Sequence, residues 1–161
     1  MEKRTIVLEV NGERREVALH PNVTLLEGLR ELGYFEVKRG CEKGDCGACA
    51  VLVEDEAVDS CLMLAWAAEG TRIITVAGLG DAAAPHPLQA AFIAGGAVQC
   101  GYCIPGMIIA AKALIDEHPE PSDQQIRAGL GGNLCRCTGF TRIFAAVREA
   151  AAELRAAGAR P

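Results

Sequence analysis

The eight cysteines of this 161-residue chain constrain its fold more than any other feature. They form two groups of four: Cys41-x4-Cys46-x2-Cys49 followed by Cys61, and Cys100-x2-Cys103 followed by Cys135-x-Cys137. Thiolates bind iron readily, and a loop spaced x4 then x2 and closed by a distant fourth cysteine is typical of plant-type [2Fe–2S] ferredoxins. No cysteine is left over. The sequence therefore predicts two iron–sulfur clusters, with these eight residues as ligands, in a chain that conducts electrons.

Three other uses of the cysteines compete with this interpretation. Zinc commonly takes four cysteines from two CxxC pairs. Cys46/Cys49 and Cys100/Cys103 are such pairs, but the x4 arm and the x1 pair match a zinc site poorly. Structural disulfides are rare in the cytosol. Thiol exchange at one CxxC pair would leave the other cysteines unexplained.

Length and charge exclude several classes of function. A chain of 161 residues fits one ordinary domain or two small ones. Its net charge of −5 and pI near 5.2 argue against a nucleic-acid reader, which would present a basic face. No apolar run reaches the ~18 residues of a membrane span. The N-terminal residues lack the apolar stretch of a signal peptide, so a cytoplasmic location is expected.

The first half of the sequence is β-rich. Asn11-Gly12 predicts a tight hairpin turn between two alternating segments. Thr24 and Glu27 form a capping box at the start of a short helix that Gly33 ends. A helix-like segment at residues 62–68 separates the last two expected strands. The expected strands cover residues 5–10, 15–19, 50–53 and 72–76.

The second half is helical. Glycines and prolines between Gly78 and Pro87 break regular structure, which predicts a domain boundary. Pro105 suits the first turn of a helix that ends before Pro119, and Ser122 begins another with a capping box. The expected helices cover residues 88–94, 105–118, 123–130 and 141–157. The predicted organisation is a first domain at residues 1–78, a linker at 79–87 and a helical domain at 88–157.

With these motifs assigned, the chain closely resembles the small iron–sulfur subunit of the molybdenum hydroxylases, the xanthine oxidase family. That family includes xanthine, aldehyde and carbon monoxide dehydrogenases, 4-hydroxybenzoyl-CoA reductase and N-heterocycle hydroxylases. The resemblance covers nearly the whole chain, in family order. The matching blocks are residues 40–49, 60–62, 86–89, 99–107 and 132–140.

The resemblance implies an α+β chain, with a β-grasp ferredoxin-like domain for the first [2Fe–2S] cluster and a four-helix domain for the second. It implies a large partner subunit that bears molybdopterin, and often a third subunit that bears FAD. Electrons would pass from molybdenum to the helical-domain cluster, then to the ferredoxin-domain cluster, and then to flavin or another acceptor. Two residues of this chain, Gln99 and Cys137, match positions that lie against the pterin; the alternative for Gln99 is an ordinary surface residue.

The chain departs from the family pattern at Ala50 and Ile104, where relatives usually carry threonine. A threonine hydroxyl at position 104 could cap the helix that begins near Pro105, and isoleucine cannot. Loss of these hydroxyls is expected to shift one or both cluster potentials. The alternative is that Ile104 packs against a partner subunit.

The sequence contains no recognisable acid–base pair, nucleophile or nucleotide-binding loop of its own. We therefore expect an electron-transfer subunit of an oxidoreductase complex, with the chemistry on substrate in a partner. The alternative is a free-standing two-cluster ferredoxin that shuttles between enzymes. The two matches at Gln99 and Cys137 favour the fixed subunit, since a shuttling carrier needs no pterin contacts.

Overall fold

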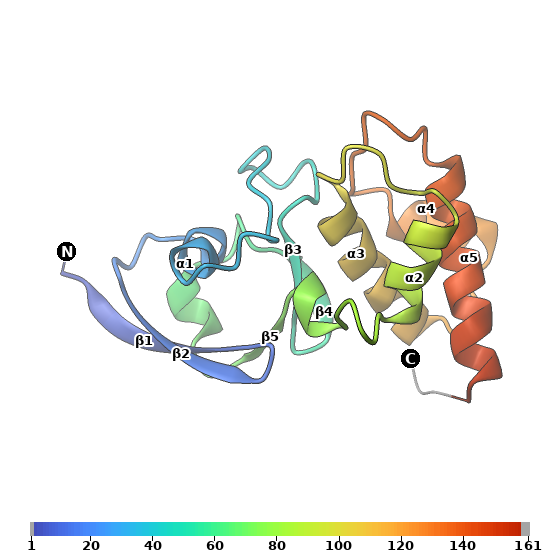
Figure 1. The fold of residues 1–161 in the computed structure, drawn as a ribbon. Helices are drawn as coiled ribbons and strands as arrows, with labels where there is room; N and C mark the ends of the chain where they lie inside the picture. Colours follow the sequence, from blue (N-terminus) through green and yellow to red (C-terminus); the bar gives the residue numbers. More distant parts are fainter. Residues whose placement is uncertain (1, 159–161) are drawn as a thin grey trace.

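The computed structural model describes residues 2–158 and forms a β-rich half and a helical half that lie side by side (Figure 1). Met1, at the start of the first predicted domain, lies outside the described residues. The β-rich half is a five-stranded sheet of order β2-β1-β5-β3-β4, in which only β1 and β5 pair in parallel. The strands are β1 (Arg4–Val10), β2 (Glu13–Leu19), β3 (Ala50–Val53), β4 (Glu56–Asp59) and β5 (Arg72–Ile74).

The predicted hairpin and first helix both form. Asn11 and Gly12 take φ angles of 54° and 80°, the positive values that the tightest hairpin turn requires. Helix α1 (Leu25–Glu31) begins at the Thr24–Glu27 capping box, and its leucines join the core beneath the sheet. The short 3₁₀ helix η1 (Ala65–Ala68) packs against α1. This layer supports the loop that carries the first cysteine group.

The helical half consists of α2 (Pro87–Ala94), α3 (Ile104–Glu117), α4 (Asp123–Gly129) and α5 (Thr141–Ala156). Its core gathers Phe92, Met107 and Ile143, all fully buried. Helix α3 also contacts β3, so the two halves share an interface along this helix. In Figure 1 the loops that carry the two cysteine groups lie along the same edge of the molecule, the upper one in that view.

The structure differs from the sequence-based expectation in the middle of the chain. Strand β4 was not predicted: Glu54 and Asp55, with φ of 49° and 73°, make a tight turn that returns the chain onto β3. The expected helix at residues 62–68 shrinks to η1. Strand β5 ends at Ile74, because residues 76–78 form the 3₁₀ helix η2 (Val76–Gly78). Within residues 2–158, no helix combines the length and apolar character needed to cross a bilayer.

Candidate metal centres

The β3–β4 hairpin brings Cys49 and Cys61 together. Ala50 pairs with Asp59 in the ladder, so the residues just outside each strand end face one another. The Ser60 hydroxyl donates to the Cys49 carbonyl over 2.7 Å and fixes this end of the hairpin. Both thiols are buried and their side chains interact. Burial is the main reason that the pKa of Cys49 rises to about 12.

The other two cysteines of the first group lie on the more open side of the loop. The Cys41 N–H donates to Cys46 Sγ over 3.4 Å, and the N–H groups of Lys43 and Asp45 donate to Cys41 Sγ over 3.5 and 3.3 Å. The Lys43 N–H is the main reason that the pKa of Cys41 falls to about 7. Main-chain donors thus stabilise the thiolate, which is the form that binds iron.

The second group has the same division into an outer and an inner pair. Cys100 Sγ and Cys137 Sγ lie 3.5 Å apart and are exposed. Cys103 and Cys135 make the inner contact, and burial raises the pKa of Cys103 to about 12. Burial alone would raise the pKa of Cys135. The Thr138 hydroxyl (3.1 Å) and N–H (3.4 Å) donate to Cys135 Sγ, and with other hydrogen bonds they outweigh burial and lower this pKa to about 7.

The sulfurs therefore approach one another in pairs rather than in tight fours. In residues 2–158, no three histidine, cysteine, aspartate or glutamate side chains converge as they would around a single ion. Zinc would draw all four sulfurs around one centre. A [2Fe–2S] cluster takes a pair of cysteines at each iron, so the pairing fits a diiron cluster better than zinc. All eight thiols are free, so the arrangement also differs from a disulfide framework.

Gln99 and Cys137 lie on one exposed face. Gln99 directly precedes Cys100, whose sulfur contacts that of Cys137, and all three side chains are open to solvent. The expectation for position 104 was wrong in its geometry. The N-cap of α3 is Cys103, without a side-chain hydrogen bond, and Ile104 is the first helical residue. A threonine there would not occupy the cap, and Ile104 is 9% exposed because it packs in the core of its own domain.

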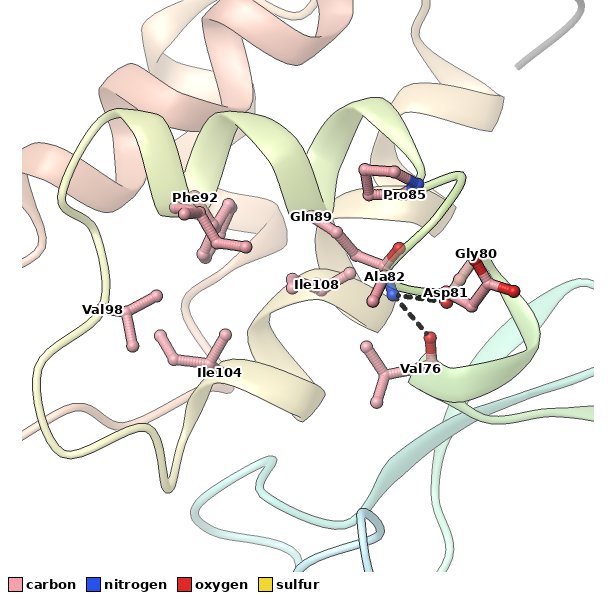
Figure 2. Close-up of a pocket in the computed structure, with 11 residues that line it drawn as sticks. Val76, Gly80, Asp81, Ala82, Pro85, Gln89, Phe92, Val98, Ile104 and Ile108 are labelled. Atoms are coloured by element: carbon pink, nitrogen blue, oxygen red, sulfur yellow. Dashed lines mark hydrogen bonds between the residues drawn. The ribbon is translucent and has the colours of Figure 1, made fainter.

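An apolar pocket of about 450 Å³ opens beside the second site (Figure 2). Val98 and Ile104, on either side of the Cys100–Cys103 segment, line it together with Phe92 and Ile108. Gln89 closes one side, where its Nε2 donates to the carbonyls of Val76 and Gly80 over 3.0 and 3.2 Å. Sequence reasoning missed this pocket, because its lining comes from the linker and two different helices.

Sequence reasoning also missed the separate structural roles of two residues, His86 and Asn133. His86 has a role that the sequence analysis did not assign: its Nδ1 accepts from the Leu88 N–H over 3.2 Å and caps α2, with Gln89 completing a capping box. Asn133 was noticed only as part of a motif, yet its buried amide reaches across to Gly47 in the first cysteine loop over 3.0 Å. The signal for His86 was its position before Pro87 and three residues before a glutamine.

Comparison with known proteins agrees with this geometry. Two family models match the chain: "2Fe-2S iron-sulfur cluster binding domain" over residues 8–75 and "[2Fe-2S] binding domain" over residues 75–148. The small FeS subunit of nicotinate dehydrogenase from Eubacterium barkeri is 50% identical, over 93% of this chain and 96% of that protein. The iron–sulfur-binding subunit of xanthine dehydrogenase from Escherichia coli O157:H7 is 45% identical, over 90% and 92%.

The solved structure of quinoline 2-oxidoreductase from Pseudomonas putida 86 contains a chain with the same fold. It superposes with a TM-score of 0.92 at 39% identity, and the match covers 98% of this chain and 99% of that one. The order of a ferredoxin-like domain and a helical domain is therefore shared along the full length described here.

Proposed function

Because this chain belongs to the iron–sulfur subunits of the molybdenum hydroxylase family, we propose that it carries electrons within an oxidoreductase complex. The electrons would enter from a large subunit that bears molybdopterin and leave to an FAD subunit or another acceptor. The observation that carries this proposal is the arrangement of the thiols: two sets of paired sulfurs, in two domains that each match a [2Fe–2S] family model.

We propose that the eight cysteines are the ligands of the two clusters. Each bound cluster supplies a centre that takes up and releases one electron. The chain itself holds the thiolates and stabilises their negative charge through the main-chain donors at Lys43 and Asp45 and the hydroxyl of Thr138. Such hydrogen bonds to sulfur are among the means by which a protein sets a cluster potential. The burial of Cys49 and Cys103 keeps water from one side of each site.

The outer face of the second site is the proposed entry point for electrons. Gln99 and Cys137 would contact the pterin of the large subunit, which their exposure next to Cys100 supports. We also propose the domain limits 1–78 and 88–157, with the linker at 79–87. The substrate would then be recognised in a pocket of the large subunit and not in this chain.

We place the complex in the cytoplasm. The support for this location is chemical: cysteines that are not joined in disulfides, two of them exposed, persist best in a reducing compartment. An FAD subunit is the proposed electron acceptor on the side of the first cluster, where the Cys41 loop is open to solvent.

A free-standing ferredoxin is the second candidate. The exposed apolar side chains near the second site argue for a fixed partner instead: Ile93 is 74% exposed, Leu134 57% and Tyr102 48%. Exposed apolar groups that gather beside a functional site are typical of docking surfaces.

Purification of the tagged chain from its native host, without air, tests the proposal. We expect co-purification with a larger chain, together with molybdenum and about four irons and four sulfides per copy of this chain. A monomer that carries both clusters and no partner would establish the free carrier. Folded protein without iron or sulfide would refute both candidates.

A further inference from the structure

One carboxylate lies against the first cysteine group without a positive partner. Asp59 Oδ1 is 3.7 Å from Cys49 Sγ. The Asp59 side chain is half-buried, and within residues 2–158 it pairs with no lysine, arginine or histidine. A negative charge therefore stands beside a sulfur of the first site, and no ion pair offsets it.

The β3–β4 hairpin fixes the position of this carboxylate. Asp59 is the last residue of β4 and pairs with Ala50, the first residue of β3. The Ser60 hydroxyl, bonded to the Cys49 carbonyl over 2.7 Å, holds the two strand ends together. The Asp59 carbonyl accepts from the Leu62 N–H over 2.9 Å, which ties down the main chain beyond the strand. Because the main chain is held on both sides and the side chain is short, the carboxylate stays near Cys49.

A pocket of about 190 Å³ between the two halves is lined by both Asp59 and Ala50. Apart from Asn133, the rest of its lining is glycine, alanine and valine. Asp59 is thus the one charged side chain in this pocket, and no group of the lining neutralises it. Protein surroundings screen such a charge less than bulk water does, so its effect on the neighbouring sulfur is stronger.

We propose that the Asp59 carboxylate lowers the reduction potential of the first cluster. The inference rests on the proposed function, because it requires a cluster bound by Cys49. A cysteine bound to iron carries no proton, so the contact of Cys49 with Asp59 is then between two negative groups. Reduction adds one electron, which comes from the reduced second cluster, and no bond forms or breaks. Because like charges repel, the added electron is less stable beside the carboxylate, and the potential falls.

Ala50 leaves this carboxylate without a donor. Residues directly opposite in an antiparallel pair carry Cβ atoms about 4.5–5.5 Å apart on one face of the sheet. A threonine at position 50 would therefore bring its hydroxyl within reach of the Asp59 carboxylate, and the pocket has room for the added atoms. Donation from that hydroxyl would draw negative charge away from Cys49. This chain has alanine there, so the sulfur experiences the full charge of Asp59.

The competing explanation is that Asp59 only stabilises the hairpin. Asp81, in the linker, shows what such a role looks like: its Oδ1 accepts from the N–H groups of Ala83 and Ala84 over 2.8 and 2.9 Å. Across the described part of the chain, no main-chain N–H and no hydroxyl donates to the Asp59 carboxylate. Its polar contact is the Cys49 sulfur, which favours a role at the cluster.

The experiment is a redox titration of the purified complex, followed through the separate EPR signal of each cluster. Asp59→Asn and Asp59→Ala both remove the charge; asparagine adds a possible donor to the sulfur and alanine does not. Glu56→Gln is the matched control, because it removes the same charge from the same strand at an exposed position. It lies three residues from Asp59 along β4, roughly 10 Å away. Ala50→Thr tests the missing donor, and iron content shows whether each complex is replete.

We expect the potential of the first cluster to rise in Asp59→Asn and Asp59→Ala, and to rise by less in Ala50→Thr. The second cluster should keep its potential in every variant, and Glu56→Gln should match the parent. Added to Asp59→Ala, the Ala50→Thr change should have no further effect, since its hydroxyl has lost the acceptor. A rise that Ala50→Thr produces equally with and without Asp59 would contradict the role given to Ala50.

An unchanged or lower potential of the first cluster in an iron-replete Asp59→Ala complex would overturn the inference. An equal rise in Glu56→Gln would overturn it as well. If both Asp59 variants lose the first cluster, Ala50→Thr decides, because it keeps the carboxylate in place; an unchanged potential there would then reject the inference. A parent complex without two clusters would instead refute the proposed function.

Discussion

Cys100 Sγ and Cys137 Sγ lie 3.5 Å apart at the surface, although 37 positions separate them in the chain. The segments that precede helices α3 and α5 deliver the two residues. The inner partners, Cys103 and Cys135, are more buried. The second site therefore has an exposed outer pair of cysteines and a more buried inner pair. We expect the two pairs to differ in their response to substitution and to oxidation.

Cys137→Ala should remove the second cluster and leave the fold intact. The side chain is exposed, so its loss takes no contact from the core. We expect the iron content to fall from about four to about two per chain, with the EPR signal of the first cluster preserved. Metal analysis and EPR of the anaerobically purified protein check this. Arg136→Ala, one residue away and also exposed, is the control and should keep all of its iron.

Removal of the clusters should expose the outer pair to oxidation. When iron is chelated without air and oxygen is then admitted, the adjacent sulfurs of Cys100 and Cys137 need little movement to form a disulfide. The buried Cys49–Cys61 pair should react more slowly, because burial keeps the pKa of Cys49 high and its thiol protonated. Peptide mapping without reductant would identify the linked residues. A Cys49–Cys61 link that forms first would contradict this order.

The sequence was sufficient for the parts of the fold whose signals are local. The hairpin at Asn11-Gly12 and the capping boxes at Thr24 and Ser122 each depend on a few neighbouring residues, and all three form where expected. Strand β4 was missed because its turn, Glu54-Asp55, lacks the glycine that usually marks such a turn, and because four residues alternate too briefly.

The candidate site also has features that the sequence predicted and features that depend on the tertiary structure. Cysteine spacing and family resemblance predicted which residues gather, but not that the sulfurs would meet as outer and inner pairs, since that depends on the β3–β4 hairpin and on helix packing. The contact between Asn133 and Gly47 joins positions 86 residues apart, and no local pattern encodes it. Position 104 shows the opposite error: a motif suggested a cap, but the helix begins one residue earlier than that reasoning required.

His86 should make the helical domain less stable in mild acid. Its neutral Nδ1 caps α2, and burial first, then the charge of Lys112, lowers its pKa below the ordinary value, with Asp116 acting against them. As the pH falls below about 6.5, the unfolded chain takes up a proton before the folded one. The stability that the neutral His86 ring contributes is therefore complete above that pH. It is lost as the pH falls through the lower pKa that His86 has in the folded chain.

Urea unfolding at pH 7.5 and pH 5.5 measures this effect, with His86→Asn as the control. Asparagine is a good N-cap that does not titrate, so the variant should match the parent at pH 7.5 and lose less stability at pH 5.5. The difference between the two proteins isolates His86 from any acid sensitivity of the clusters. Parallel losses in parent and variant would show that His86 does not titrate in this range.

Asn11 should contribute to stability through its side chain as well as its turn geometry. Its Oδ1 accepts from the Thr75 N–H over 2.9 Å, and its Nδ2 donates to the Thr75 hydroxyl over 3.0 Å. Thr75 is fully buried and donates onward to Glu36 over 2.7 Å, so it depends on these partners. Asn11→Gly keeps the positive φ but leaves the Thr75 N–H unpaired. We expect a loss of about 1–3 kcal/mol in the free energy of unfolding. Asn11→Asp retains the acceptor and should lose less, so equal losses in the two variants would contradict the role given to Oδ1.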